Sequence, residues 1–482
     1  MKKIINIYAA LLLVLFSSCD MLDIKPVNSM LPVSVEDFES VLLGGYPREN
    51  FFINTDLATD NVYANLATAD EGNKAYEPWY IWAATHQLDG AEDKYWTQLY
   101  KSIFYANTVL DEFAGKTPTA EEKVLFETVR GEAYALRAYC YFYLVNLYAE
   151  NYAPENLEKP GVPMPLSAAD VHQNTQNNVR VAVGKVWEQI EKDLEEATKD
   201  LIGKEGKSKY RFDYISLQGF KSRVYLFMGK YEEAIEAASY VIDSKALFDM
   251  NEIQPYLDGL DKISEAFGHN YGFIDTDYQN EVLFFVGGKG NTNPFYYYKT
   301  RFKPVEELLN LCKREAGVVD YRRYIFDSGV EPGSADYVER GPTVYRMFAA
   351  QQSDVYSIGY KLSEAYVTRA EAYVRKGEKD LAIADLNKLL VTRIRKKDFV
   401  ELNKADFTNE TALQRVLEER RVELAFDGGL RWFDLRRLGK PAIQHGYKDG
   451  KVYTLEQGDL RYVLQIPESE QEVSPNMPLN PR

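Results

Sequence analysis

Two segments of the chain, 148 residues apart, repeat the same spacing of small and aromatic residues. In each segment a small residue lies three positions before a tyrosine, and a glycine lies four positions after it. The matching positions are Ser222, Tyr225, Gly229, Ala234, Ile235 and Val241 in the first segment, and Ala370, Tyr373, Gly377, Ala382, Ile383 and Leu389 in the second. Because small residues let two helices approach and glycine closes a tight turn, each segment is predicted to form a helix pair.

This spacing is typical of the tetratricopeptide repeat, whose helix pairs bury their apolar faces only against neighbouring pairs. Several pairs are therefore expected to stack into a scaffold. Residues 131–148, with Ala138 and Tyr141 three apart, are predicted to form a further first helix. Residues 96–110 carry another helical stripe, made by Trp96, Leu99, Ile103, Ala106 and Leu110. The predicted fold class is mainly α.

Residues 246–345 differ from the repeats in composition. Glycine and proline interrupt short apolar runs there, and the run 282–286 is predicted to be a strand. Residues 50–93 are similarly irregular. We therefore expect a loop-rich, partly β region on the helical scaffold, and such loops commonly carry binding residues.

The first residues are typical of an export signal. Lys2 and Lys3 precede the apolar run 4–16, which is too short to span a membrane. The run ends in Leu-Phe-Ser-Ser before Cys19, so residues 1–18 are predicted to be a signal peptide and Cys19 to receive lipid. The alternative is an ordinary signal with an unrelated cysteine. Residues 19–50, rich in proline, are predicted to be a tether.

The charge and the remaining cysteines exclude some classes of partner and structure. The net charge is −16, so the surface should repel nucleic acid and anionic lipid. Cys140 lies in an aromatic helical run and Cys312 follows a leucine-rich one, so both are predicted to be small buried residues. An exported chain of 482 residues needs no disulfide framework.

Residues 415–438, called the signature segment below, carry alternating charges among apolar positions. Leu413, Val416, Leu417 and Leu424 predict a helix that ends at Gly428 and Gly429, and a second apolar stripe follows, made by Trp432, Phe433, Leu435 and Leu438. The charges are Glu418, Glu419, Arg420, Arg421, Glu423, Asp427, Arg431, Asp434, Arg436 and Arg437. Arginines nearly match the acids, which favours a structural ion-pair network, partly within the helix, over a catalytic carboxylate pair.

Residues 418–437 resemble the signature of the SusD/RagB family, the surface glycan-binding lipoproteins of some Gram-negative bacteria. Residues 361–377 resemble a second family motif, with Lys361 where arginine is usual, and residues 464–476 resemble the family's closing segment, with Ser474 where asparagine is common. The resemblance runs from Cys19 to the last residues. It implies an N-terminal part over 51–245 and a C-terminal part over 246–482, intertwined in one globular unit.

No catalytic, metal or cofactor site is apparent in the sequence. His86, His172, His269 and His445 lie far apart, and neither a phosphate loop nor a Gly-x-Ser-x-Gly motif is present. The family resemblance likewise implies a protein that is not an enzyme. A glycoside hydrolase remains a distant alternative, because it needs only two suitably placed carboxylates.

Two aromatic segments in the irregular regions have the composition of a glycan site. A pyranose ring offers an apolar face and a rim of hydroxyls, which flat aromatic rings beside polar groups can bind. The candidates are Tyr76, Trp79, Tyr80 and Trp82 in one segment, and Asn293, Tyr296, Tyr297 and Tyr298 in the other. The alternative for each ring is packing between loops and helices.

The resemblance implies binding of oligo- or polysaccharide by a lipid-anchored protein on the outer-membrane surface. It further implies delivery to a SusC-like TonB-dependent transporter as partner. The alternative is a secreted tetratricopeptide protein that binds a peptide or another protein.

Overall fold

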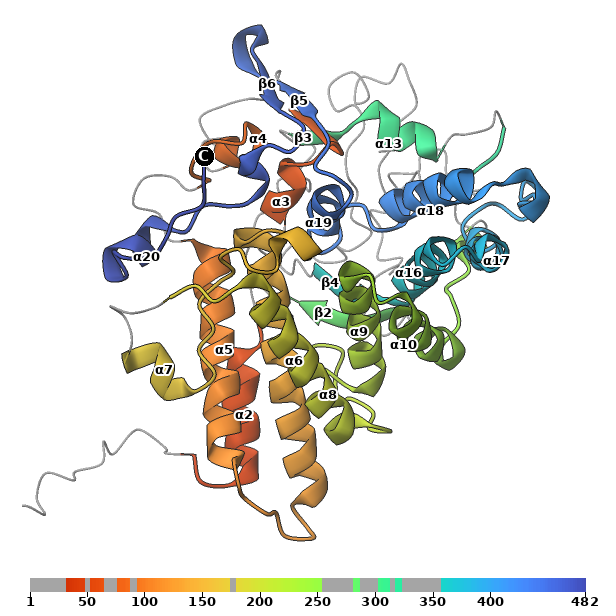
Figure 1. The fold of residues 1–482 in the computed structure, drawn as a ribbon. Helices are drawn as coiled ribbons and strands as arrows, with labels where there is room; N and C mark the ends of the chain where they lie inside the picture. Colours follow the sequence, from red (N-terminus) through yellow and green to blue (C-terminus); the bar gives the residue numbers. More distant parts are fainter. Residues whose placement is uncertain are drawn as a thin grey trace, which may run out of the picture.

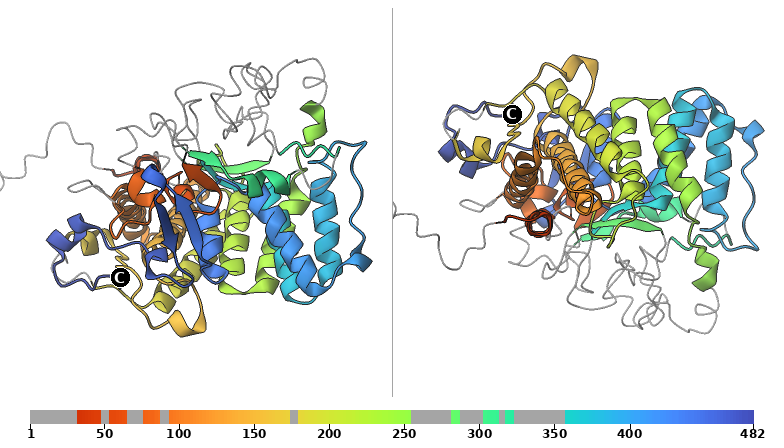
Figure 2. Two further views of the ribbon diagram at one scale, coloured as in Figure 1. Left: turned by 90° about the horizontal axis from the view of Figure 1, so that it is seen from above. Right: turned by 90° about the horizontal axis from the view of Figure 1, so that it is seen from below.

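The computed structural model describes residues 32–47, 53–64, 76–86, 93–173, 179–253, 281–286, 302–312, 317–322 and 357–482. These residues fold mainly into helices, which confirms the predicted class (Figure 1). Helix pairs follow one another across the molecule, and the short strands lie beside them (Figure 2). None of the helices described is long and apolar enough to cross a membrane.

The N-terminal layer contains α2 (Val35–Gly45), α5 (Lys94–Phe113), α6 (Lys123–Tyr148) and α8 (Val183–Leu201). α2 starts at a capping box on Ser34 and packs on α5, so part of the predicted tether is helical. The predicted stripe on 96–110 is confirmed, since all five of its side chains are buried. α6 packs against α8 at Gly131, where a Cβ would come within 2.8 Å of Asp200 Cβ. That contact explains why a helix interior carries glycine here.

The two predicted repeats are confirmed. They form the pairs α9 (Tyr214–Met228) with α10 (Tyr231–Ser244), and α16 (Leu362–Arg375) with α17 (Lys379–Leu390). Gly229 and Gly377 close the turns in the left-handed region, with φ of 72° and 85°. α10 packs on α16, so the second pair stacks directly on the first although more than a hundred residues separate them (Figure 1).

Within the described residues the strands form three two-stranded antiparallel sheets. β1 (Val62–Ala64) pairs with β3 (Phe302–Pro304), β2 (Val282–Val286) pairs with β4 (Ser357–Lys361), and β5 (Ile443–Gly446) pairs with β6 (Val452–Leu455). The strand predicted over 282–286 is confirmed as β2, and all five of its residues are buried. The sheets are small additions to a helical core.

The signature segment is helical with a break, as predicted. α18 (Asn409–Glu423) and α19 (Leu430–Arg437) are joined by a turn in which Phe426, Gly428 and Gly429 all have positive φ. The shorter helices are α3 (Ile53–Leu57), α4 (Glu77–Tyr80), α7 (Ala168–Gln173), α13 (Glu306–Leu311) and α20 (Glu468–Val473), and the 3-10 turns are η3 (Pro154–Asn156), η4 (Met250–Ile253), η5 (Lys404–Asp406), η6 (Lys448–Gly450) and η7 (Leu460–Tyr462).

The C-terminal tail packs on the end of α6. Leu464 N–H donates to Leu147 O at 2.9 Å, and the Asn480 side chain donates to Tyr148 O at 2.8 Å. The buried Arg180 guanidinium donates to the same Tyr148 carbonyl at 3.1 Å. These donors satisfy carbonyls that a helix C-terminus leaves without partners, and positive charge there also complements the helix dipole.

Candidate functional site

Three of the predicted glycan-binding rings are buried. Trp79, Tyr80 and Trp82 expose 5%, 0% and 4% of their surface, whereas Tyr76 is half-buried. The prediction placed them on exposed loops, and on this point it is corrected. Trp79 and Tyr80 lie on the short helix α4, and Trp82 follows it. Tyr80 packs against Phe302 of β3, and both Tyr80 and Trp82 pack against His445 of β5.

His445 on β5 lies between two of these rings. Its imidazole stacks on Tyr80 and on Trp82, with ring centroids 4.2 Å apart in both cases. Nδ1 lies 2.7 Å from Tyr80 O and Nε2 lies 3.0 Å from Thr59 O. Burial lowers the pKa of His445, although the two carbonyls and Asp60 oppose that effect. Sequence reasoning missed this contact, because His445 is more than 360 residues away from its partners.

Trp79 packs in a second cluster of hydrogen-bonded aromatic residues. The centroid of its ring lies 4.6 Å from that of His86 and 5.2 Å from that of Tyr95. The buried Asp93 accepts from His86 Nε2 at 2.8 Å and from the Tyr148 hydroxyl at 2.7 Å. Asp93 also caps α5, so this cluster joins the α4 segment to the helical core.

In the β1–β3 sheet, the last residue of β1 lies opposite the first residue of β3. Ala64 pairs with Phe302, so the chain leaves β1 and enters β3 at the same end of the sheet. Phe302 contacts Tyr80 and Tyr76, with ring centroids 5.1 and 6.4 Å apart. Asn293, Tyr296, Tyr297 and Tyr298 themselves lie outside the described residues.

The acids of the signature segment form buried ion pairs, mostly with other elements of the fold. Glu423 pairs with Arg393 at 3.1 Å and with Arg322 at 3.3 Å. Burial by itself would raise the pKa of Glu423, but Arg393, Lys361 and Arg322 hold it well below its usual range. Lys361 also donates to Glu423 O at 2.6 Å and pairs with Asp427 at 2.8 Å. Lys361, which stands where the family usually has arginine, therefore still forms an ion pair with a buried carboxylate.

A second buried group connects α18, α19 and α16. Asp434 accepts from Arg420 and from Arg437, each at 2.8 Å, and Arg437 donates to Glu371 at 2.6 Å. The pKa of Asp434 is lowered to about 2 because the two arginines outweigh its burial. These carboxylates stay ionised, so the predicted structural network is confirmed. Its main contacts run between elements, and the pair of Arg415 with Glu419 lies within the helix, as expected for part of the network.

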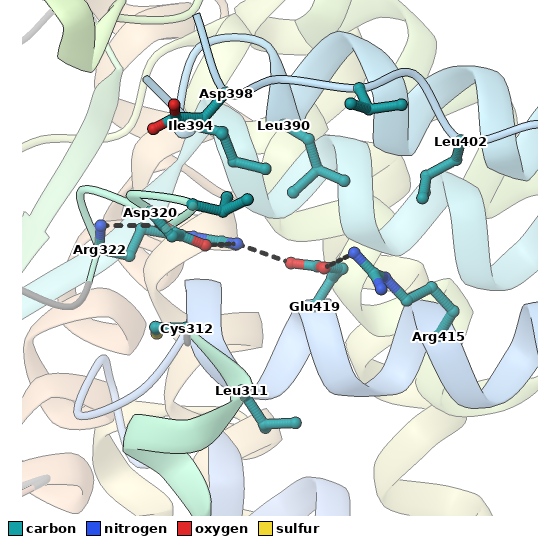
Figure 3. A pocket seen from close by; sticks show the side chains of 12 residues that line it. Leu311, Cys312, Asp320, Arg322, Leu390, Ile394, Asp398, Leu402, Arg415 and Glu419 are labelled. Carbon is teal, nitrogen blue, oxygen red and sulfur yellow. Dashed lines mark hydrogen bonds and ion pairs between the residues drawn. The ribbon is translucent and has the colours of Figure 1, made fainter. Parts of the chain in front are cut away.

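A pocket of about 90 Å³ lies beside this network (Figure 3). Four charged side chains lie along it in a row: Asp320, Arg322, Glu419 and Arg415. Glu419 forms ion pairs with Arg322 at 2.8 Å and with Arg415 at 2.9 Å. Leu390, Ile394 and Leu402 form an apolar wall. The four charged side chains of the row are paired with one another. Within the described residues, no cluster of three His, Cys, Asp or Glu side chains could hold a metal ion.

Comparisons with known proteins agree with this architecture. A SusD-like family model described as "Starch-binding associating with outer membrane" matches residues 20–226, and the SusD family model matches residues 349–482. SusD-like protein P38 of Formosa agariphila is 25% identical over 389 residues, which cover 72% of each chain.

Solved structures show the same fold. A SusD superfamily protein from Bacteroides thetaiotaomicron has a TM-score of 0.72 and 23% identity, covering 93% of this chain and 100% of that one. A SusD-like carbohydrate binding protein from Bacteroides vulgatus has a TM-score of 0.66 and 19% identity, covering 92% and 97%. Two family models, sequence relatives and fold thus agree, and the chain belongs to the SusD/RagB family.

Proposed function

We propose that this protein binds oligo- or polysaccharide at the cell surface and delivers it to a SusC-like TonB-dependent transporter of the outer membrane. Family membership supports the binding role, since one matching family model is described as starch-binding and one structural relative as a carbohydrate binding protein. The transporter partner and the lipid on Cys19 rest on the family resemblance and on the sequence before Cys19.

The observation that carries the site is the pairing of Ala64 with Phe302. Ala64 ends β1 and Phe302 begins β3, beside the half-buried Tyr76, and the aromatic segments come after β1 and before β3 in the sequence. In this proposal Tyr76, Asn293 and Tyr296–Tyr298 contact the glycan. Trp79, Tyr80 and Trp82 form a packed base and do not contact the glycan, because their rings are occupied by protein neighbours.

Titration calorimetry against a panel of polysaccharides tests the binding role. The parent protein should bind at least one of them, and Tyr297→Ala should lose roughly 1 to 3 kcal/mol of binding if the ring stacks, a range taken from aromatic stacking on bases. A parent protein that binds no glycan in the panel would contradict the proposal. Release of reducing ends from a bound glycan would instead indicate a hydrolase.

Delivery to a transporter calls for a separate experiment. The lipidated protein should copurify with a TonB-dependent transporter when it is extracted from native outer membranes in mild detergent. Copurification that persists after Tyr297→Ala would show that the transporter contact is independent of the glycan site.

A further inference from the structure

Asp60 is held by two arginines of the signature segment. Arg431 on α19 donates from Nε and Nη2 to the two carboxylate oxygens, at 2.8 and 2.6 Å. Arg421 on α18 donates to the Asp60 backbone carbonyl at 2.9 Å and lies 3.5 Å from its carboxylate. Burial by itself would raise the pKa of Asp60, but the two arginines lower it below its usual value. The two arginines therefore join α18 and α19 to a turn that lies about 360 residues earlier in the sequence.

Each of the four residues of the turn, 58–61, is bound by a side chain from another part of the fold. Trp82 Nε1 donates to Ala58 O at 2.9 Å, and His445 Nε2 lies 3.0 Å from Thr59 O. Arg421 Nε donates to the Asn61 side chain at 2.8 Å. Contacts on four consecutive residues leave the turn little freedom.

This turn adjoins the start of β1 and the end of β3. β1 starts at Val62, directly after Asn61, and Val305 N–H, which follows β3, donates to Asn61 O at 2.9 Å. At the other end of β1, Ala64 N–H donates to the Tyr80 hydroxyl at 2.8 Å. A shift of the turn would therefore move β1, β3 and the α4 segment together.

We propose that Asp60, which forms ion pairs with Arg421 and Arg431, is a positioning residue for the part of the glycan site at the β1–β3 sheet, where Phe302 contacts Tyr76. The arginines hold the start of β1, and the sheet in turn places Phe302 against Tyr76 and Tyr80. In this way the signature segment supports ligand binding without touching the ligand. The inference rests on the proposed function, since it assumes that glycan binds beside this sheet.

The chain offers a matched control for Asp60→Asn. Asp200 on α8 is also held by one arginine through two hydrogen bonds, from Arg130 Nε and Nη2 at 2.8 Å each, but it lies between α6 and α8. Both substitutions remove one carboxylate from a forked pair of the same kind. Glycan affinity is measured by calorimetry well below the melting temperature of either variant. Asp60→Asn should weaken binding by about tenfold or more, and Asp200→Asn by less than about twofold.

Hydrogen exchange supplies a readout that needs no ligand. In Asp60→Asn, peptides that contain Ala64 and Val305 should exchange about tenfold faster than in the parent, and they should be unchanged in Asp200→Asn. Unchanged exchange in Asp60→Asn would overturn the inference. So would faster exchange with undiminished affinity for a glycan that the parent binds. If the parent binds no glycan, the proposed function fails, and the exchange rates alone decide whether Asp60 fixes the strands.

Discussion

Arg393, which follows α17, forms a buried ion pair with Glu423 at the end of α18, with Nη2 and Oε1 3.1 Å apart. The same guanidinium donates to both carboxylate oxygens of Glu281 at 2.9 Å, next to β2. Three parts of the chain thus meet at one arginine. Because the pair is almost free of solvent, removing Glu423 takes one of two buried carboxylates from Arg393 and leaves Glu281 as its remaining counter-ion.

We expect Glu423→Ala to destabilise the fold by about 3 kcal/mol, because Arg393 and Arg322 would both lose a buried carboxylate. Urea denaturation followed by circular dichroism measures this change. Glu188→Ala is the control, since Glu188 pairs with Lys185 on the surface and should leave the unfolding midpoint unchanged. Loss of glycan binding in Glu423→Ala with an unchanged midpoint would point to a functional site instead.

Asp434 should contribute to stability in a pH-dependent way. Its pKa is lowered from 3.8 to about 2 in the folded state, so the unfolded chain binds its proton at a higher pH. The contribution, about 2 kcal/mol, is complete above pH 4 and is lost as the pH falls from about 4 to 2. In Asp434→Asn the unfolding free energy should be lower at pH 7 and should fall less steeply over this range. An identical pH profile in parent and variant would contradict the assignment.

The helical scaffold could be predicted because its signals are local. The spacing from Ser222 to Gly229, repeated at 370–377, gives a helix and its turn within a few residues, and both were found where expected. The acids of the signature segment could be recognised as structural from the arginines around them. The actual partners of its charged residues, such as Arg393 for Glu423 and Glu371 for Arg437, could not be predicted, because periodicity carries no information on contacts between distant elements.

The burial of the α4 rings also escaped prediction, for a physical reason. An aromatic residue in an irregular segment has the same local sequence whether it faces a ligand or a neighbouring strand. The burial of Trp82 depends on contacts with His445 and with Ala58 O, which lie on other segments. For Tyr80 it depends on Ala64 N–H and Gly446 O, which its hydroxyl joins. Only the assembled sheet pairs show these contacts.

Cys19→Ala should release the protein from the membrane, because the apolar segment 4–16 ends at a sequence typical of lipoprotein processing. In this prediction the lipid on Cys19 is the anchor, so one substitution should be enough to remove it. Fractionation and labelling with radioactive palmitate measure the effect. A variant that stays with the membrane and keeps the label of the parent would contradict the prediction, and Cys140→Ala is the control.

Trp79→Ala should unfold nearly as early as Trp96→Ala, although the two residues lie in segments of very different character. Both indoles are buried to the same extent, with 5% of their surface exposed, and each packs against further aromatic rings, Tyr95 for Trp79 and Tyr148 for Trp96. Removing either ring should cost about 3 to 5 kcal/mol. Thermal melting of both variants, beside Tyr297→Ala, separates packing from binding, since a ring that stacks on glycan should lose affinity at an unchanged melting temperature. If Trp79→Ala keeps the parent's melting temperature and loses glycan binding, Trp79 contacts the ligand directly and its place in the packed base is wrong.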